Sequence, residues 1–174
     1  FNFFVWTLRG AFRPDSIKYL HKICLVNKIS LVFLLEPVFE VKQLDVVWNR
    51  LKLDHGASFL NGKVWCLWSR VFKLSFVEGE EQVVHARLTF PSGEVVNIST
   101  VYDKCTRVGR RPLWSCLECF NMGRSESCIV AGDFNVIAST EKCRERQPAN
   151  VANMEEFNTS MFVCGLSPVD FDGC

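Results

Sequence analysis

The apolar positions of the chain form short runs that alternate between strand spacing and helix spacing. Solid apolar runs of strand length at 1–8 and 30–35 flank a segment with helical spacing that begins at Asp15 or Ser16 and continues to Val26. A continuous apolar run bounded by turn residues is typical of a strand buried on both faces. The strand–helix–strand order therefore predicts a parallel pair joined by a crossover helix.

Beyond this first unit, the pattern changes to strands that follow one another directly. After a helix expected at 41–51, the pattern predicts strands at 63–68, 72–77, 83–90 and 95–102, with a tight hairpin turn at 91–94. It then predicts a helix at 111–120, a buried strand at 127–131, a charged surface loop at 141–150 and a helix at 153–164. In the last helix we expect an inward face, ended by Gly165 and made of Met154, Phe157, Met161 and Phe162. A crossover unit combined with hairpins predicts two packed sheets with helices outside.

Composition limits the classes of protein that this pattern can represent. The 174 residues are 48% hydrophobic and 22% charged, which suits one globular domain and argues against disorder. The net charge of +1 provides no strong overall field, so nucleic-acid binding would need a local basic patch. No apolar run approaches the roughly 20 residues that cross a bilayer, and no signal peptide is visible.

The nine cysteines are scattered, and several lie inside apolar runs. Cys116 and Cys119 form a C-x-x-C pair, but no second pair or histidine cluster stands at zinc-ligand spacing. We therefore expect a reducing compartment, the nucleus or the cytoplasm. The chain begins with Phe1 instead of Met, which favours a fragment or an excerpt of a longer product.

Candidate chemistry lies where apolar strands end. Glu36, Tyr102, Asp133 and Asn135 each follow or close such a run. Strand ends are where α/β proteins place ligand groups, and Mg²⁺ takes one or two carboxylates together with water and phosphate oxygens. If the backbone were extended from Asp133 to Asn135, both side chains would point the same way. One could then act on a water molecule and the other could donate to a phosphate oxygen.

Each of these signals is weak alone. A single strand-end Glu is usually a solvated residue at the rim of a sheet. The residues Gly132-Asp133-Phe134-Asn135 are also typical of a turn. The order in which the four polar residues occur is what changes the interpretation.

That order resembles the endonuclease/exonuclease/phosphatase superfamily. The blocks are Trp6-Thr7-Leu8-Arg9-Gly10, Leu34-Leu35-Glu36, Val101-Tyr102 and Gly132-Asp133-Phe134-Asn135. Flanking blocks at 62–68, 101–107, 110–114, 154–158 and 164–166 narrow the resemblance to the endonuclease domain of plant LINE-type (non-LTR) retrotransposons and their host-gene relatives. The resemblance extends over the whole chain.

The resemblance implies a fold, a cofactor and a role for each residue. The fold is a four-layer α/β/β/α sandwich of two packed mixed sheets with outer helices, here incomplete at the C-terminus. In this family the residue matching Glu36 binds the divalent metal, Mg²⁺, and the residue matching Asp133 acts on the nucleophile or the leaving group. The residues matching Tyr102 and Asn135 contact the scissile phosphate. The implied partner is nucleic acid, DNA in the first instance, with no membrane and no obligate protein partner.

The chain also departs from the family pattern. Thr7 stands where the family has Asn beside the metal, and a hydroxyl lacks the second donor of an amide. Pro168 stands where an Asp is usual. The family's later strands and its closing Ser-Asp-His motif would lie after Cys174, so we expect 1–174 to be a domain without its catalytic histidine. His21, His55 and His85 do not match that motif.

Three hypotheses follow from the sequence. The first is a truncated or decayed Mg²⁺-dependent endonuclease domain of retrotransposon origin, expected to be inactive alone. The second is an excerpt of a longer active nuclease that is followed by a reverse transcriptase. The third is a non-catalytic nucleic-acid-binding module, for which Arg107, Arg110 and Arg111 form a weak candidate phosphate-binding cluster. A cluster of this kind is more often a solvated helix start.

Overall fold

The computed structural model describes residues 1–8, 14–37, 40–77, 81–121, 125–139 and 150–169. The chain divides into two compact units. The first unit comprises Phe1–Tyr102 and Glu126–Asp133, and the second comprises Asp103–Ser125 and Phe134–Cys174. None of the described helices has the length and apolar character needed to cross a bilayer.

The first sheet of the first unit contains the predicted parallel pair. Its strands are β1 (Asn2–Thr7), β2 (Ile29–Leu35), β4 (Val64–Trp68) and β3 (His55–Phe59), in the order β1-β2-β4-β3. β1 and β2 are parallel, joined through α1 (Pro14–Val26), whereas β4 is antiparallel to both of its neighbours. The predicted strand–helix–strand unit is therefore confirmed.

Strand β3 was not predicted from the sequence. Its residues Gly56, Ala57 and Ser58 give no alternation of large apolar and polar side chains. A Cβ at Gly56 would lie 2.3 Å from the Trp48 ring, so the close approach of the two segments requires a residue without a side chain. The formation of this strand thus depends on what packs against it, and the pattern of hydrophobic positions does not predict it.

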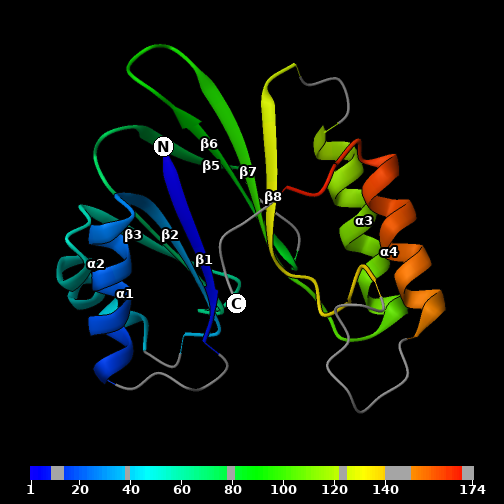
Figure 1. Ribbon diagram of the computed structural model, residues 1–174, viewed down its shortest axis with the longest axis horizontal. Helices are drawn as coiled ribbons and strands as arrows, with labels where there is room; N and C mark the ends of the chain where they lie inside the picture. Colours follow the sequence, from blue (N-terminus) through cyan, green and yellow to red (C-terminus); the bar gives the residue numbers. More distant parts are fainter. Residues whose placement is uncertain (9–13, 38–39, 78–80, 122–124, 140–149, 170–174) are drawn as a thin grey trace. The chain divides into compact units, whose positions relative to one another are not determined.

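Two helices cover one face of this sheet (Figure 1). The helices are α1 and α2 (Leu44–Leu51), and a short 3₁₀ turn, η1 (Val41–Gln43), precedes α2. Lys52 ends α2 in the left-handed conformation, with φ 60°. The apolar cluster between the helices and the sheet contains Ile17, Leu20, Cys24, Val47, Leu51, Val32, Leu34, Trp65 and Leu67.

The second sheet consists of β5 (Lys73–Val77), β6 (Val83–Thr89), β7 (Val95–Tyr102) and β8 (Ser127–Asp133), in that order. β5, β6 and β7 are antiparallel neighbours, and β7 and β8 are parallel. The predicted turn at 91–94 joins β6 to β7, and the Phe90 amide donates to the Glu94 carbonyl at 2.9 Å. The predicted hairpin is confirmed.

The two sheets pack face to face through a second apolar cluster. Leu31, Phe33 and Leu35 of β2 face it, whereas Val32 and Leu34 face the helices. The second sheet contributes Val84, Leu88, Val96 and Ile98. Aromatic rings join the layers, with the centroids of Phe59 and Phe76 4.4 Å apart. Because β2 is buried on both faces, its sequence is a continuous apolar run.

The second unit contains α3 (Arg107–Asn121) and α4 (Val151–Val163), which lie side by side (Figure 1). Helix α3 starts four residues before its predicted start, because the Thr106 hydroxyl accepts a hydrogen bond from the Gly109 amide there and Pro112 is accommodated inside the helix. Gly165, with φ +67°, follows α4 as predicted. The inward placement of Phe162 is wrong, since that side chain is 84% exposed. It follows Met161 by one residue, which is about 100° around the helix. The loop predicted at 141–150 lies outside the described residues except for Asn150, which caps α4.

The fold class is confirmed as mixed α/β: the described residues form two four-stranded mixed sheets and four α-helices.

Candidate active site

Glu36 follows directly on β2 and has an unusual backbone. Its φ of +51° lies in the left-handed region, which a residue with a long side chain rarely adopts. The conformation is maintained by its own amide, which donates to the Lys63 carbonyl at 2.8 Å, just before β4. Backbone strain of this kind costs about 1–3 kcal/mol and clusters at functional sites. Lys28, Lys52 and Leu60 also have positive φ values, so the contacts of the Glu36 side chain, and not its backbone alone, distinguish it from an ordinary residue at the rim of a sheet.

Tyr102 joins Glu36 to the second sheet. It is the last residue of β7, and its hydroxyl donates a hydrogen bond to Oε1 of Glu36. Both side chains are partly buried, and 66 residues separate them in the sequence. The Lys63 ammonium lies 5.4 Å from the centroid of the Tyr102 ring. Lys63 was not predicted as a site residue, because its only sequence signal was its place in a strand-flanking turn.

Asp133 lies next to Tyr102 in the adjacent strand. The two are register partners in the parallel pair of β7 and β8, so their side chains project from the same face of the sheet. This face includes Ile129, which packs between the sheets. Thr7, the last residue of β1, is in turn the register partner of Leu35, the residue before Glu36. The carboxyl ends of β1, β2, β7 and β8 thus carry Thr7, Glu36, Tyr102 and Asp133.

Gly132 is the only residue type that fits its position. Its φ is +149°, and a Cβ built there would lie 2.0 Å from the carbonyl oxygen of Val101. Such a contact cannot exist without movement of the backbone. The glycine therefore allows β8 to approach β7 closely enough for Asp133 to pair with Tyr102.

Asn135 lies in the second unit, and its backbone is not extended. Its φ is +48°, which Asn tolerates better than most residues. Its side-chain amide donates to the Asp103 carbonyl at 2.7 Å. Asp133 and Asn135 therefore do not lie on one extended segment.

The residue between them, Phe134, anchors the loop to the two helices of the second unit. Its ring stacks on Trp114 of α3 with a centroid separation of 6.3 Å and meets Phe157 of α4 edge-on at 5.2 Å. Aromatic pairs in these geometries each contribute about 0.5–1.5 kcal/mol beyond their buried area. The loop that carries Asn135 is therefore anchored through Phe134.

The three arginines of the candidate phosphate cluster have different surroundings. Arg107 and Arg111 both lie beside the Glu156 carboxylate: Arg107 donates a hydrogen bond to it, and Nε of Arg111 lies 3.7 Å from Oε1. The Arg107 hydrogen bond holds the pKa of Glu156 below its usual value. Arg110 is only 2% exposed and faces Asp103. Contact between these arginines and phosphate stays a prediction.

The three histidines lie on β3, β6 and α1. His55 begins β3 at the end of its sheet where β2 begins, opposite the end that carries Glu36. His85 lies on β6, where its Nδ1 is 2.8 Å from the Ser99 hydroxyl. His21 lies on α1.

The residues at the strand ends suit a hard divalent cation. Glu36 follows β2 and Asp133 closes β8, and among the described residues no group of three or more His, Cys, Asp or Glu side chains could hold a metal ion. Mg²⁺ needs only one or two carboxylates, because it keeps several waters and takes phosphate oxygens. The donor set therefore fits Mg²⁺ better than a metal that requires a complete protein cage.

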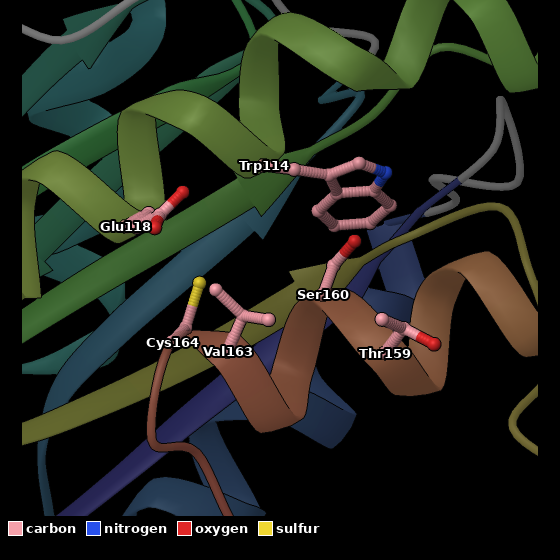
Figure 2. Close-up of a pocket in the computed structure, with 6 residues that line it drawn as sticks. All are labelled: Trp114, Glu118, Thr159, Ser160, Val163 and Cys164. Atoms are coloured by element: carbon pink, nitrogen blue, oxygen red, sulfur yellow. The ribbon is translucent and has the colours of Figure 1, made fainter.

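A pocket of about 220 Å³ in the second unit is a separate feature (Figure 2). Its walls are Trp114 and Glu118 of α3, with Thr159, Ser160, Val163 and Cys164 from α4 and its end. Figure 2 shows the Trp114 ring between the two helices. None of the predicted site residues lines this pocket.

No protein-family model and no curated protein matches this sequence. Solved structures do match, and all of the following cover 90% or more of the chain. The endonuclease domain of TRAS1, a telomere-specific non-LTR retrotransposon, matches with a TM-score of 0.64 and 12% identity, over 92% of this chain and 69% of that one. The AP endonuclease LMAP from Leishmania major matches with a TM-score of 0.66 and 15% identity, over 92% and 66%. An endonuclease/exonuclease/phosphatase family protein from Leptotrichia buccalis C-1013-b matches with a TM-score of 0.57 and 13% identity, over 90% and 71%.

At these identities the likeness establishes the fold. The chain has the fold of endonuclease/exonuclease/phosphatase proteins, so the resemblance seen in the sequence is confirmed at that level. The chain spans about two thirds of the length of the solved structures it matches.

Proposed function

We propose that the chain is a metal-dependent, phosphodiester-cleaving domain of the nuclease type. One observation carries the proposal: the hydrogen bond from Tyr102 to Glu36, which joins the carboxyl ends of strands from both sheets, with Asp133 in register beside Tyr102. A strained carboxylate, a phenol and a second carboxylate are the groups that metal-assisted phosphoryl chemistry uses. The nuclease-like fold supports the same function.

Each residue has a proposed role. Glu36 and Asp133 would hold a divalent cation such as Mg²⁺, which when bound supplies Lewis-acid stabilisation of phosphate charge. Tyr102 fixes the Glu36 carboxylate with its one hydroxyl hydrogen, and it would donate to a phosphate oxygen by giving up that bond. Asp133 also orients the attacking water or accepts its proton, and Asn135 offers its amide to the phosphate. Thr7 supplies a single hydroxyl beside this edge, in register with Leu35.

We further propose that the substrate is DNA and that the domain is of retrotransposon origin. The motif order along the sequence supports this assignment, and so do two structural neighbours, a retrotransposon endonuclease domain and an AP endonuclease. The described cysteines are free thiols, which suits a reducing compartment such as the nucleus or the cytoplasm.

We also propose that hydrolysis by this chain alone is weak. His55 lies at the opposite end of its sheet from Glu36, His85 bonds to Ser99 on the second sheet, and His21 lies on α1. A general acid or base typically contributes about 10²- to 10⁴-fold to the rate. Binding of metal and phosphate by these residues should therefore be easier to detect than turnover.

The first test is calorimetric titration of the purified chain with Mg²⁺ and Mn²⁺. Glu36→Gln removes the charge and keeps the shape, and we expect it to weaken binding about tenfold or more, as loss of a charged ligand does. Glu40→Gln is the matched control, because Glu40 is an exposed carboxylate that pairs with Lys42. Equal affinities of the wild type and Glu36→Gln would refute the metal site.

The second test is nicking of supercoiled plasmid with Mg²⁺. Any nicking should depend on metal and disappear in both Glu36→Gln and Asp133→Asn. Strong wild-type nicking that both variants abolish would support the site and overturn the claim of weak hydrolysis. Nicking that survives both substitutions would show that the activity comes from elsewhere.

A further inference from the structure

Arg110 is a buried cation in the second unit. Its side chain is 2% exposed, and the Asp103 carboxylate that it faces is fully buried. Its Nε lies 3.9 Å from Oδ2 of Asp103. A charge is rarely buried unless a partner compensates it, because its desolvation is expensive. Asp103 compensates the buried charge of Arg110, and the other contacts of Arg110 show which segments it holds in place.

The guanidinium binds two segments that are distant in the sequence. Its Nη1 lies 3.4 Å from the Lys104 carbonyl and 3.2 Å from the Cys105 carbonyl, both in the segment after β7. The same nitrogen donates to the Asn135 carbonyl at 3.3 Å, in the segment after β8. Arg110 thus connects the two loops that follow the parallel strands of the second sheet.

Asn135 is bound to the same group of residues from its other side. Its side-chain amide donates to the Asp103 carbonyl at 2.7 Å. Its main-chain carbonyl accepts from Arg110, and its backbone has a positive φ of +48°. Both the orientation of the Asn135 amide and the backbone that presents it therefore depend on Asp103 and Arg110.

Only an arginine can make these contacts together. Nε faces the carboxylate while Nη1 reaches three carbonyls, and the planar guanidinium fixes the spacing between the two nitrogens. A lysine has one nitrogen and can serve either the carboxylate or the carbonyls. Because the group is buried and its contacts are with the protein, contact with a solvent-exposed phosphate is the weaker interpretation.

We propose that Arg110 is a positioning residue that sets the conformation of Asn135, and does not itself contact the phosphate. This inference rests on the proposed function for the role of Asn135 in phosphate contact. The inference that Arg110 sets the conformation of Asn135 rests only on the hydrogen bonds described above.

The test compares the full chain with Arg110→Lys, which keeps the positive charge and removes the planar guanidinium with its several donors. In the wild type, NMR should show side-chain amide protons of Asn135 that exchange slowly with solvent, with the resonance assigned by Asn135→Asp. In Arg110→Lys we expect exchange about tenfold faster, the effect of losing one ordinary hydrogen bond. Metal-dependent cleavage should fall about a hundredfold through kcat, the scale of a misplaced catalytic group, with Mg²⁺ affinity unchanged.

Arg87→Lys is the matched control, because Arg87 makes an arginine–carboxylate pair with Glu126 at 3.0 Å in the other unit. It should leave Asn135 exchange and cleavage as in the wild type. If Arg110→Lys does not fold, Asp103→Asn provides the second variant, since it removes the carboxylate and keeps the carbonyl that accepts from Asn135. It should accelerate Asn135 exchange by a smaller factor.

The outcomes separate the two proposals. Unchanged Asn135 exchange and unchanged cleavage in Arg110→Lys would overturn the positioning role, because only the charge would then matter. Faster Asn135 exchange in a chain whose wild type neither binds metal nor cleaves DNA would support the positioning role and refute the proposed function. A parallel loss of Mg²⁺ affinity in Arg110→Lys would indicate general structural damage and would also overturn the inference.

Discussion

Replacing Gly132 by Ala should damage both the fold and the site. The added Cβ would lie 2.0 Å from the Val101 oxygen and 2.7 Å from the Val101 nitrogen, both of which are backbone atoms in the adjacent strand. An ordinary contact between carbon and oxygen needs about 3.5 Å, so β8 would have to move away from β7 by more than an ångström. This displacement falls one residue before the pairing of Tyr102 with Asp133.

The magnitude has two parts. A non-glycine residue at a positive φ costs about 1–3 kcal/mol, and overpacking against a rigid neighbour costs about 1–3 kcal/mol. Together they predict a loss of about 2–6 kcal/mol in the free energy of unfolding, compared with a typical total of about 5–15 kcal/mol. Gly93→Ala is the matched control, because Gly93 has φ +86° and no atom within 4 Å of its added Cβ. That control should lose only the backbone part, about 1–3 kcal/mol.

Urea denaturation followed by tryptophan fluorescence measures both variants. A lower midpoint with an unchanged slope would report stability alone. Calorimetry on the folded Gly132→Ala variant should also show weaker Mg²⁺ binding, because Asp133 has moved relative to Tyr102. If the two variants differed by less than about 0.5 kcal/mol, the reasoning from the close strand approach would be refuted.

Three further predictions concern the rest of the fold. Hydrogen bonds from the Arg70 main chain and side chain hold the pKa of Asp54 below its usual value. A lowered folded-state pKa stabilises the fold at neutral pH and ceases to do so as the pH falls through it, so the stability advantage over Asp54→Asn should shrink as the pH falls below about 5 in urea titrations. Burial raises the pKa of the Cys66 thiol well above its usual value, so a thiol-specific disulfide reagent should label exposed Cys119 quickly and Cys66 only after unfolding. Leu20→Ala, at a fully buried position, should cost about 2–5 kcal/mol in thermal or urea unfolding, and a cost below about 1 kcal/mol would contradict the described packing.

The elements with the strongest apolar periodicity were predictable from the sequence. The continuous apolar run of β2 and the helical spacing of α1 predicted a parallel pair, and that pair is present. The hairpin at 91–94 was readable because turn residues separate two strand-like runs. Local patterns succeed here because a segment buried on a known face must repeat its apolar residues with the period of its own backbone.

The positions of the site residues along the chain could be read in the same way, but not their contacts. Glu36, Tyr102 and Asp133 each close an apolar run, which is a local property. The bond between Tyr102 and Glu36 joins residues 66 apart, and it exists because two separate sheets pack on one apolar cluster. No pattern within a segment specifies which face of one sheet meets another.

Tertiary structure alone decided the features that contradict local preference. β3 is a strand although its glycine, alanine and serine have little strand propensity, and Arg110 is buried although arginine prefers solvent. Glu36 adopts a positive φ that its own side chain does not favour. In each case contacts from distant residues supply the free energy that overrides the local preference. The motif order was therefore enough to recognise the nuclease-like fold, whereas the strained Glu36, its bond to Tyr102 and the buried Arg110 became visible only in the folded chain.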